Sequence, residues 1–196
     1  MLKLGYLFEI PAVKAYAGNP TSMAELIEET KSMVGCEGFV VRFASGHMIK
    51  VKAEDYLRKH KAKDSLSREK NVIELIVTEK LDDVKAFLDA KDLVRVREFE
   101  TAFWEGLKET SVELLLLRAA AARLGKDADK RSYAVEFVQQ LKKEVQPFMY
   151  KMFDTNVHPM ELLKNVVASQ CGSQTKIDEC LWIFNCHWNA PAASEE

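Results

Sequence analysis

The spacing of hydrophobic residues changes near residue 53, from short apolar runs to helical periodicity. Two five-residue runs rich in β-branched and aromatic residues, 39–43 and 48–52, predict strands joined by a tight turn. Ahead of them, Ser22 followed by Glu25 three positions later is a capping box, which predicts a helix that ends at Gly35. The first part of the chain is therefore expected to be a helix followed by a β-hairpin.

Beyond residue 53 the apolar spacing remains helical almost to the end of the chain. Asp82 and Asp83 are expected to cap a helix, Gly125 to end a long one, and Pro147 to break another. The expected fold is α+β and mostly α, with a hairpin too small to bury its own core ahead of an all-helical part. The predicted helices are 53–63, 71–77, 84–90, 96–108 with an extension through 114–124, 130–145, 160–168 and 177–187.

Composition narrows the class of protein. Of the 196 residues, 47% are hydrophobic and 30% charged, which is typical of a globular protein. The net charge of −2 means that any contact with nucleic acid has to come from a local basic patch. No apolar run is long enough for a membrane span. The four cysteines do not have the spacing of a disulfide framework or a zinc site, so we expect free thiols in a soluble, cytoplasmic protein.

Charged residues at the hairpin suggest a phosphate site. Glu37 and Gly38 stand at the mouth of the first strand, where glycine allows the backbone to approach a ligand closely. Lys50 and Lys52 are two residues apart on the second strand, so both ammonium groups leave from one face. A carboxylate beside two lysines suits a triphosphate and its metal ion. An ordinary hairpin with a charged solvent face has the same pattern.

These residues also resemble a known family. Glu37-Gly38-Phe39-Val40 and Lys50-Val51-Lys52 resemble the E-G-[YF]-V and K-x-K motifs of the covalent nucleotidyltransferases. Later matches narrow the resemblance to the phage T4-type RNA ligase, which repairs broken tRNA, over the stretch from about residue 6 to about residue 184. Those matches are Tyr56, His60, Lys63, Phe99-Glu100-Thr101, Gly125-Lys126-Asp127 and Ser132-Tyr133-Ala134.

The resemblance implies a division into domains. Residues 1–55 would be the C-terminal end of the nucleotidyltransferase domain, and 56–188 the all-helical C-terminal domain of the RNA ligase. The small and polar residues of 189–196 predict a disordered tail. For a phage-encoded protein, the location would be the cytoplasm of the host.

The resemblance also assigns roles to single residues, with ATP and Mg²⁺ as cofactors. It implies catalytic roles for Glu37, Lys50 and Lys52. Tyr56 and Asp82 have ordinary explanations as well, the first as a core aromatic residue and the second as a helix cap. ATP would be bound by Gly38, Lys50, Lys52 and Tyr56, and Mg²⁺ by Glu37 and Asp82.

RNA contacts are implied in the helical domain, at Lys126, Lys130 and Arg131. The basic run 58–63 is a further candidate, because each phosphate contact adds salt-dependent affinity. A solvated helix surface explains both groups of basic residues equally well. The RNA expected from the resemblance is tRNA-like, with broken ends.

One motif of the family is missing from the chain. Covalent nucleotidyltransferases use a lysine in K-x-[DE]-G as nucleophile, and no such motif occurs in these 196 residues. We therefore expect the C-terminal part of a split or truncated ATP-dependent RNA ligase that joins 5′-phosphate and 3′-hydroxyl ends. It would be unable to adenylylate itself and active only with a separately encoded N-terminal half. The alternatives are a non-catalytic RNA-binding or structural module, or a role in tail-fibre attachment, a second role of this ligase type.

Overall fold

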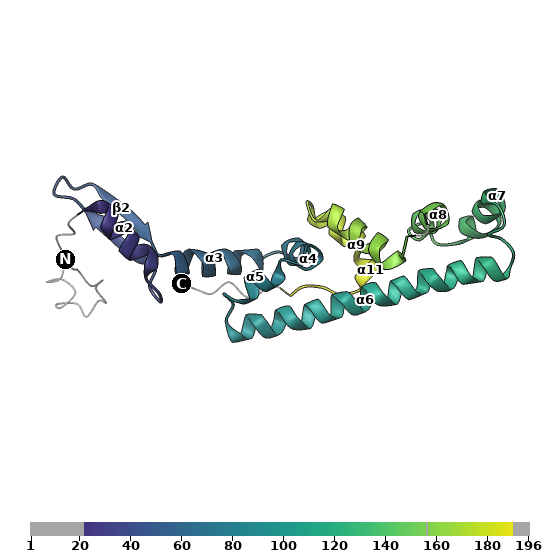
Figure 1. Ribbon diagram of the computed structural model, residues 1–196, viewed down its shortest axis with the longest axis horizontal. Coiled ribbons are helices and arrows are strands. Elements are labelled where there is room, and N and C mark those ends of the chain that lie inside the picture. Colours follow the sequence, from purple (N-terminus) through teal and green to yellow (C-terminus); the bar gives the residue numbers. More distant parts are fainter. Residues whose placement is uncertain (1–21, 156, 190–196) are drawn as a thin grey trace. The chain divides into compact units, whose positions relative to one another are not determined.

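The computed structural model describes residues 22–155 and 157–189, and the chain divides into two compact units (Figure 1). The first unit is Met1–Arg58 and the second is Lys59–Glu196. The structure is mostly helical with a two-stranded antiparallel sheet, which confirms the predicted fold class. The domain roles expected for 1–55 and 56–188 stay a prediction. Residues 1–21 and most of the predicted tail lie outside the described residues.

The first unit forms from local signals in the sequence. Helix α2 (Met23–Ser32) begins as predicted, with the Glu25 N–H donating to Ser22 Oγ at 3.1 Å. Strand β2 (Met48–Lys52) has the predicted bounds, and β1 (Gly38–Arg42) begins and ends one residue earlier than expected. The strands pair antiparallel. Helix α3 (Glu54–Ser65) begins directly after β2.

The hairpin has little core of its own. No residue of β1 or β2 is fully buried, and Val40 is 62% exposed. Helix α2 contacts both strands, yet the buried residues described in this unit are only Thr30 and Ala53. A two-stranded ribbon with so little buried apolar surface is marginally stable in water. The hairpin therefore depends on further packing for stability.

This thin core predicts uneven protection from hydrogen exchange. Backbone amides of β1 and β2 should exchange much faster than those in the middle of the long helix α6 (Ala90–Arg123), because local opening costs less free energy where few apolar contacts are lost. Exchange followed by mass spectrometry on this chain measures the difference. Equal protection of the hairpin and α6 would show that the hairpin completes its own core.

The second unit is built along α6, which has 34 residues. Asp89 caps its start by accepting the Asp92 N–H at 3.0 Å, and the helix ends before Gly125, whose φ is +63°. The other helices of this unit are shorter, and those labelled in Figure 1 lie along one side of α6. They are α4 (Glu69–Val77), α5 (Leu81–Lys85), α7 (Lys130–Ser132), α8 (Gln146–Thr155), α9 (Pro159–Gln170), α10 (Gln174–Glu179) and α11 (Leu181–Phe184), with a π-helical turn (Tyr133–Phe137) and a 3₁₀ turn (Val138–Gln140) after α7.

Several helix boundaries differ from the predicted ones. Pro147 lies in the first turn of α8, where its missing N–H is not needed, and so does not end a helix. Asp82 and Asp83 lie inside the first turn of α5, not before it. The helix predicted over 130–145 is divided into short α, π and 3₁₀ turns. The helix predicted over 177–187 is two short ones, the second ended by left-handed Asn185 with φ 47°.

A close crossing of backbones joins α11 to α6. A Cβ atom at Gly106 would lie 2.0 Å from the carbonyl oxygen of Phe184, so a larger residue cannot fit without movement of the backbone. One turn further along α6, the buried Thr110 hydroxyl donates to the Ile183 carbonyl at 2.8 Å. Glycine in a helix interior costs about 1 kcal/mol relative to alanine. Packing against α11 therefore explains this glycine, and the Phe103 and Phe184 rings, 5.1 Å apart, lie beside it.

This crossing predicts the effect of a single methyl group. Gly106→Ala should lower the free energy of unfolding by about 1–3 kcal/mol or more, because overpacking outweighs the gain in helix propensity. Chemical denaturation of this chain measures the change. Gly172→Ala is the matched control, since a Cβ at Gly172 meets nothing within 4 Å. A Gly106→Ala variant as stable as this control would mean that α11 does not pack against α6 as described.

In the part of the chain that the structure describes, no helix is both long and apolar enough to cross a membrane.

Candidate functional site

Three charged residues of the first unit lie together at one end of the hairpin. Lys50 Nζ is 2.5 Å from Glu37 Oε1, and Lys52 Nζ is 3.8 Å from the same oxygen. The strand register, which sets Gly38 opposite Lys52 and Val40 opposite Lys50, brings both lysines to this face. The Ala53 N–H donates to the Glu37 carbonyl at 3.0 Å and so continues the ladder to Glu37. We call Glu37, Lys50 and Lys52 the charge cluster.

Tyr56 extends the charge cluster from the first turn of α3. The Lys52 ammonium lies 5.2 Å from the centre of the Tyr56 ring, a cation–π distance that restrains the lysine. Two lysines against one glutamate leave the cluster with one net positive charge, and all three side chains are between 37% and 51% exposed. The three charged side chains are therefore accessible to solvent. Use of the charge cluster by a nucleotide stays a prediction.

Gly38 has a structural reason to be glycine. Its φ is +131°, and a Cβ would lie 2.1 Å from the Val51 carbonyl oxygen of the neighbouring strand. The close approach that the structure shows is thus to β2. Contact between Gly38 and a ligand remains a prediction from the family resemblance.

Asp82, expected to bind a metal with Glu37, lies in the second unit and has another partner. Its side chain is 89% exposed, and Oδ1 accepts from Lys85 Nζ at 3.0 Å. Lys85 also donates to Glu100 Oε2 at 2.6 Å. Burial by itself would lower the pKa of Lys85, but the hydrogen bonds to Glu100 and Asp82 outweigh it and raise that pKa.

Among residues 22–155 and 157–189, no group of three or more His, Cys, Asp or Glu side chains is placed to hold a metal ion. The cysteines are free thiols. Burial raises the pKa of Cys171 and of Cys186 to about 11, so both stay protonated near neutral pH. A metal role for Glu37 and Asp82 stays a prediction.

Two of the three predicted RNA-binding residues form ion pairs with carboxylates. Lys126 forms an ion pair with Glu136, and Lys130 Nζ lies 2.7 and 3.0 Å from the two Asp154 oxygens. The Arg131 guanidinium forms no hydrogen bond or ion pair with any residue that the structure describes. An RNA phosphate at this loop would therefore meet Arg131 directly and would compete with Asp154 for Lys130.

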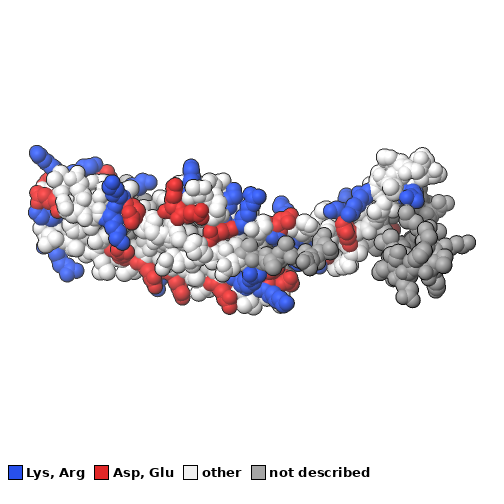
Figure 2. Space-filling view, turned by 180° about the vertical axis from the view of Figure 1, so that it is seen from behind, with Lys and Arg blue, Asp and Glu red and all other residues white. Residues whose placement is uncertain are grey.

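The basic run 58–63 is also partly neutralised. Arg58 pairs with Glu54 at 3.0 Å, one helical turn earlier, and Lys63 lies 3.7 Å from Asp89. On the face in Figure 2, lysine and arginine side chains alternate with carboxylates over the helical unit and form no extended basic surface. Exposed ion pairs of this kind contribute little to stability. Contact between this run and RNA stays a prediction.

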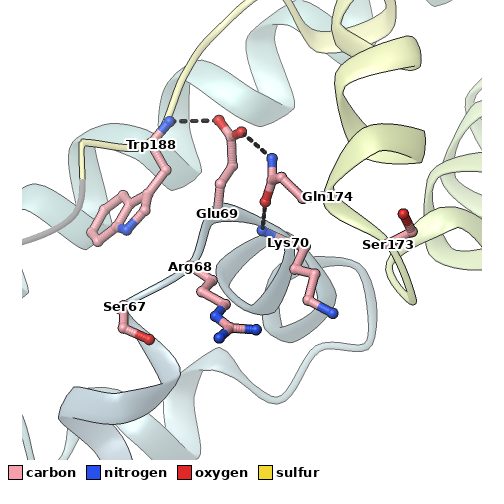
Figure 3. Close-up of a pocket in the computed structure, with 7 residues that line it drawn as sticks. All are labelled: Ser67, Arg68, Glu69, Lys70, Ser173, Gln174 and Trp188. Atoms are coloured by element: carbon pink, nitrogen blue, oxygen red, sulfur yellow. Dashed lines mark hydrogen bonds between the residues drawn. The ribbon is translucent and has the colours of Figure 1, made fainter.

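A pocket that the sequence did not predict lies in the second unit, with a volume of about 670 Å³. It is formed at the start of α4, where the Glu69 side chain is only 12% exposed. Glu69 Oε1 accepts the Trp188 N–H at 2.7 Å and Oε2 accepts from Gln174 Nε2 at 2.9 Å (Figure 3). We call it the Glu69 pocket, lined by Ser67, Arg68, Glu69, Lys70, Ser173, Gln174 and Trp188.

Comparison with protein families identifies the class of the helical part. The family of the T4 RNA ligase 1 C-terminal domain matches residues 63–175, more than half of the chain. The chain therefore belongs to the T4 RNA ligase 1 C-terminal domain family, which confirms the resemblance to T4-type RNA ligases. The match includes the Lys126–Arg131 loop and Asp82, while the charge cluster lies before it. Searches of curated proteins and of solved structures found no match.

The loop geometry predicts that Arg131, rather than the paired Lys126 and Lys130, would contribute most to any RNA binding at this loop. Arg131→Glu should weaken binding of a tRNA-like RNA by about tenfold at low salt and reduce the salt dependence of the affinity, because one phosphate contact is lost. Asp154→Asn should strengthen binding by releasing Lys130. Fluorescence anisotropy across a salt series measures both effects. Arg97→Glu on the exposed side of α6 is the matched control, and equal effects of the two arginine changes would remove this loop as an RNA contact.

Proposed function

We propose that the chain is the C-terminal part of an ATP-dependent RNA ligase that joins 5′-phosphate and 3′-hydroxyl ends of broken, tRNA-like RNA. Membership of the T4 RNA ligase 1 C-terminal domain family supports a role related to RNA ligation. The observation that carries the catalytic part is the charge cluster, since Lys50 and Lys52 extend from one strand face beside Glu37. The proposed location is the cytoplasm, which for a phage protein is that of the host.

The residues of the charge cluster suit ATP and Mg²⁺ by their chemistry. When bound, ATP supplies the adenylyl group and Mg²⁺ offsets phosphate charge. Lys50 and Lys52 would hold phosphate oxygens by charge-assisted hydrogen bonds, and Glu37 would hold the metal ion or a ribose hydroxyl. Tyr56 would keep the Lys52 ammonium in position against its ring. Positioned cations of this kind stabilise charge that develops at phosphate during transfer.

The nucleophile has to come from outside these residues. The K-x-[DE]-G motif does not occur in the 196-residue sequence, and without a nucleophile binding gives no covalent product. We infer that N-terminal ligase residues outside this sequence supply the lysine. The thin core of the hairpin supports this inference, because a two-stranded sheet gains stability when further strands join it.

A non-catalytic RNA-binding module is the second candidate. It is favoured by the position of the family match, which covers 63–175 and so leaves out the charge cluster. In that case the helical unit alone would bind RNA, and Glu37, Lys50 and Lys52 would be surface charges. The two candidates differ in whether the charge cluster affects transfer of AMP.

An adenylylation assay separates the candidates. Incubated with labelled ATP and Mg²⁺, this chain alone should form no covalent adenylate. Mixed with an N-terminal ligase half that carries K-x-[DE]-G, it should cause label to appear on that half and allow 5′-phosphate and 3′-hydroxyl RNA ends to be joined. Label on the isolated chain would contradict the proposal, because it would require a nucleophile within these residues.

Variants of the charge cluster test the role of its residues. Lys50→Ala, Lys52→Ala and Glu37→Ala should each slow labelling of the complemented pair by about 10²–10³-fold, as expected for loss of one charge-stabilising group. Arg42→Ala, at the far end of the same hairpin face, is the matched control. Normal labelling with both lysines replaced would show that the hairpin is structural and would favour the non-catalytic module.

A further inference from the structure

Two cationic side chains, Arg68 and Lys70, line the Glu69 pocket on the side away from its only lining carboxylate. Figure 3 shows the Glu69 carboxylate directed toward Trp188 and Gln174, while the Arg68 and Lys70 side chains extend to the opposite side. Neighbouring residues at the start of α4 therefore separate the two signs of charge within one pocket.

Hydrogen bonds within the fold occupy the Glu69 carboxylate. It accepts from the Trp188 N–H and from Gln174 Nε2, and His187 Nδ1 lies 3.5 Å from Oε1. Gln174 also accepts the Lys70 N–H at 3.2 Å and so joins α10 to the start of α4. Because these contacts satisfy the carboxylate, Glu69 does not form an ion pair with Arg68 or Lys70.

Donors remain available on the other side of the pocket. The Arg68 guanidinium has no hydrogen bond or ion pair with a described residue, and Lys70 Nζ has one, to the Gly172 carbonyl at 3.1 Å. The Ser173 hydroxyl likewise has no partner within residues 22–155 and 157–189. Ser67, whose hydroxyl donates to the Asp64 carbonyl at 2.7 Å, offers only acceptor capacity. A guanidinium and an ammonium that line one pocket suit a phosphate oxyanion, while Figure 3 draws the Ser173 hydroxyl directed away from both cations.

We propose that the Glu69 pocket binds a phosphate group of RNA, through Arg68 and Lys70. That the ligand is RNA rests on the proposed ligase function. That the bound group is an anion rests on the two cationic side chains that line the pocket. Trp188, which is 8% exposed, forms a wall of the pocket, held by its indole N–H to the Leu66 carbonyl at 2.7 Å.

The site is separate from the loop at Arg131. Figure 1 shows α4 and α7 toward opposite ends of α6, so the pocket and that loop contact different parts of any RNA bound along the second unit. A phosphate contact fixes register and orientation without reading sequence. The Glu69 pocket would therefore position RNA on the helical unit irrespective of its base sequence.

The test uses this chain with a labelled tRNA-like hairpin RNA, followed by fluorescence anisotropy over a salt series. In Arg68→Gln with Lys70→Gln, the affinity should fall by about tenfold or more at low salt. The slope of log affinity against log salt should become shallower by about one to two. The matched control is Arg97→Gln with Lys108→Gln, which removes two exposed cations from α6. Thermal unfolding of both double variants checks that the fold is retained, and Arg68→Gln alone serves if loss of the Lys70 contact destabilises the chain.

Three outcomes would overturn the assignment. If the chain binds RNA and the pocket variant behaves like the control variant, the pocket is not an RNA contact, while the proposed function stands. If the unaltered chain binds no RNA at any salt concentration, both the pocket assignment and the RNA substrate fail. Inorganic phosphate and AMP, tested as competitors, identify the third outcome: if the pocket variant loses binding of these small anions but keeps its RNA affinity, the site takes free phosphate compounds instead of RNA.

Discussion

The crossing of α6 and α11 at Gly106 is the constraint on which the rest of the helical unit depends. Because no side chain separates the two backbones, α11 lies close enough for its Ile183 carbonyl to accept from Thr110. The left-handed turn at Asn185 then leads the chain to Trp188, which reaches both Glu69 and the Leu66 carbonyl. The absence of a side chain at Gly106 thus allows α11 to pack closely on α6. The position of α11 in turn determines where Trp188 lines the Glu69 pocket.

The two units place their charges by different physical means. In the hairpin, strand register alone brings Lys50 and Lys52 beside Glu37, and almost no buried core supports the arrangement. In the helical unit, a continuous apolar core positions the polar groups, and Glu69 is held by donors from distant parts of the chain. A site that depends only on strand pairing can form before the rest of its domain has folded. This would suit a hairpin that joins a larger sheet. The site in the helical unit exists only when the whole unit has folded.

The same difference explains what the sequence could predict. The hairpin, the shared face of Lys50 and Lys52 and the Ser22 cap follow from period-two alternation and short-range capping, both of which are local. The Glu69 pocket joins residues 67–70 to Ser173, Gln174 and Trp188. These residues are far apart in the sequence, so the spacing of residues along the chain could not predict the contact. The helix predicted over 130–145 failed for a related reason: the buried Tyr133 hydroxyl donates to the Met149 carbonyl at 3.1 Å, in a segment of π and 3₁₀ turns that apolar periodicity cannot distinguish from an α-helix.

The length of α6 has a consequence for the shape of a nucleic-acid partner. At 1.5 Å per residue, its 34 residues form a straight rod of about 50 Å. Basic groups toward the two ends of such a rod stay at a nearly constant separation, which a flexible single strand can match only at an entropic cost. A base-paired arm keeps its phosphates at fixed intervals and meets both ends without that loss. If RNA spans the helical unit as proposed, a continuous helix of this length would therefore favour structured RNA over single-stranded RNA, because of its rigidity.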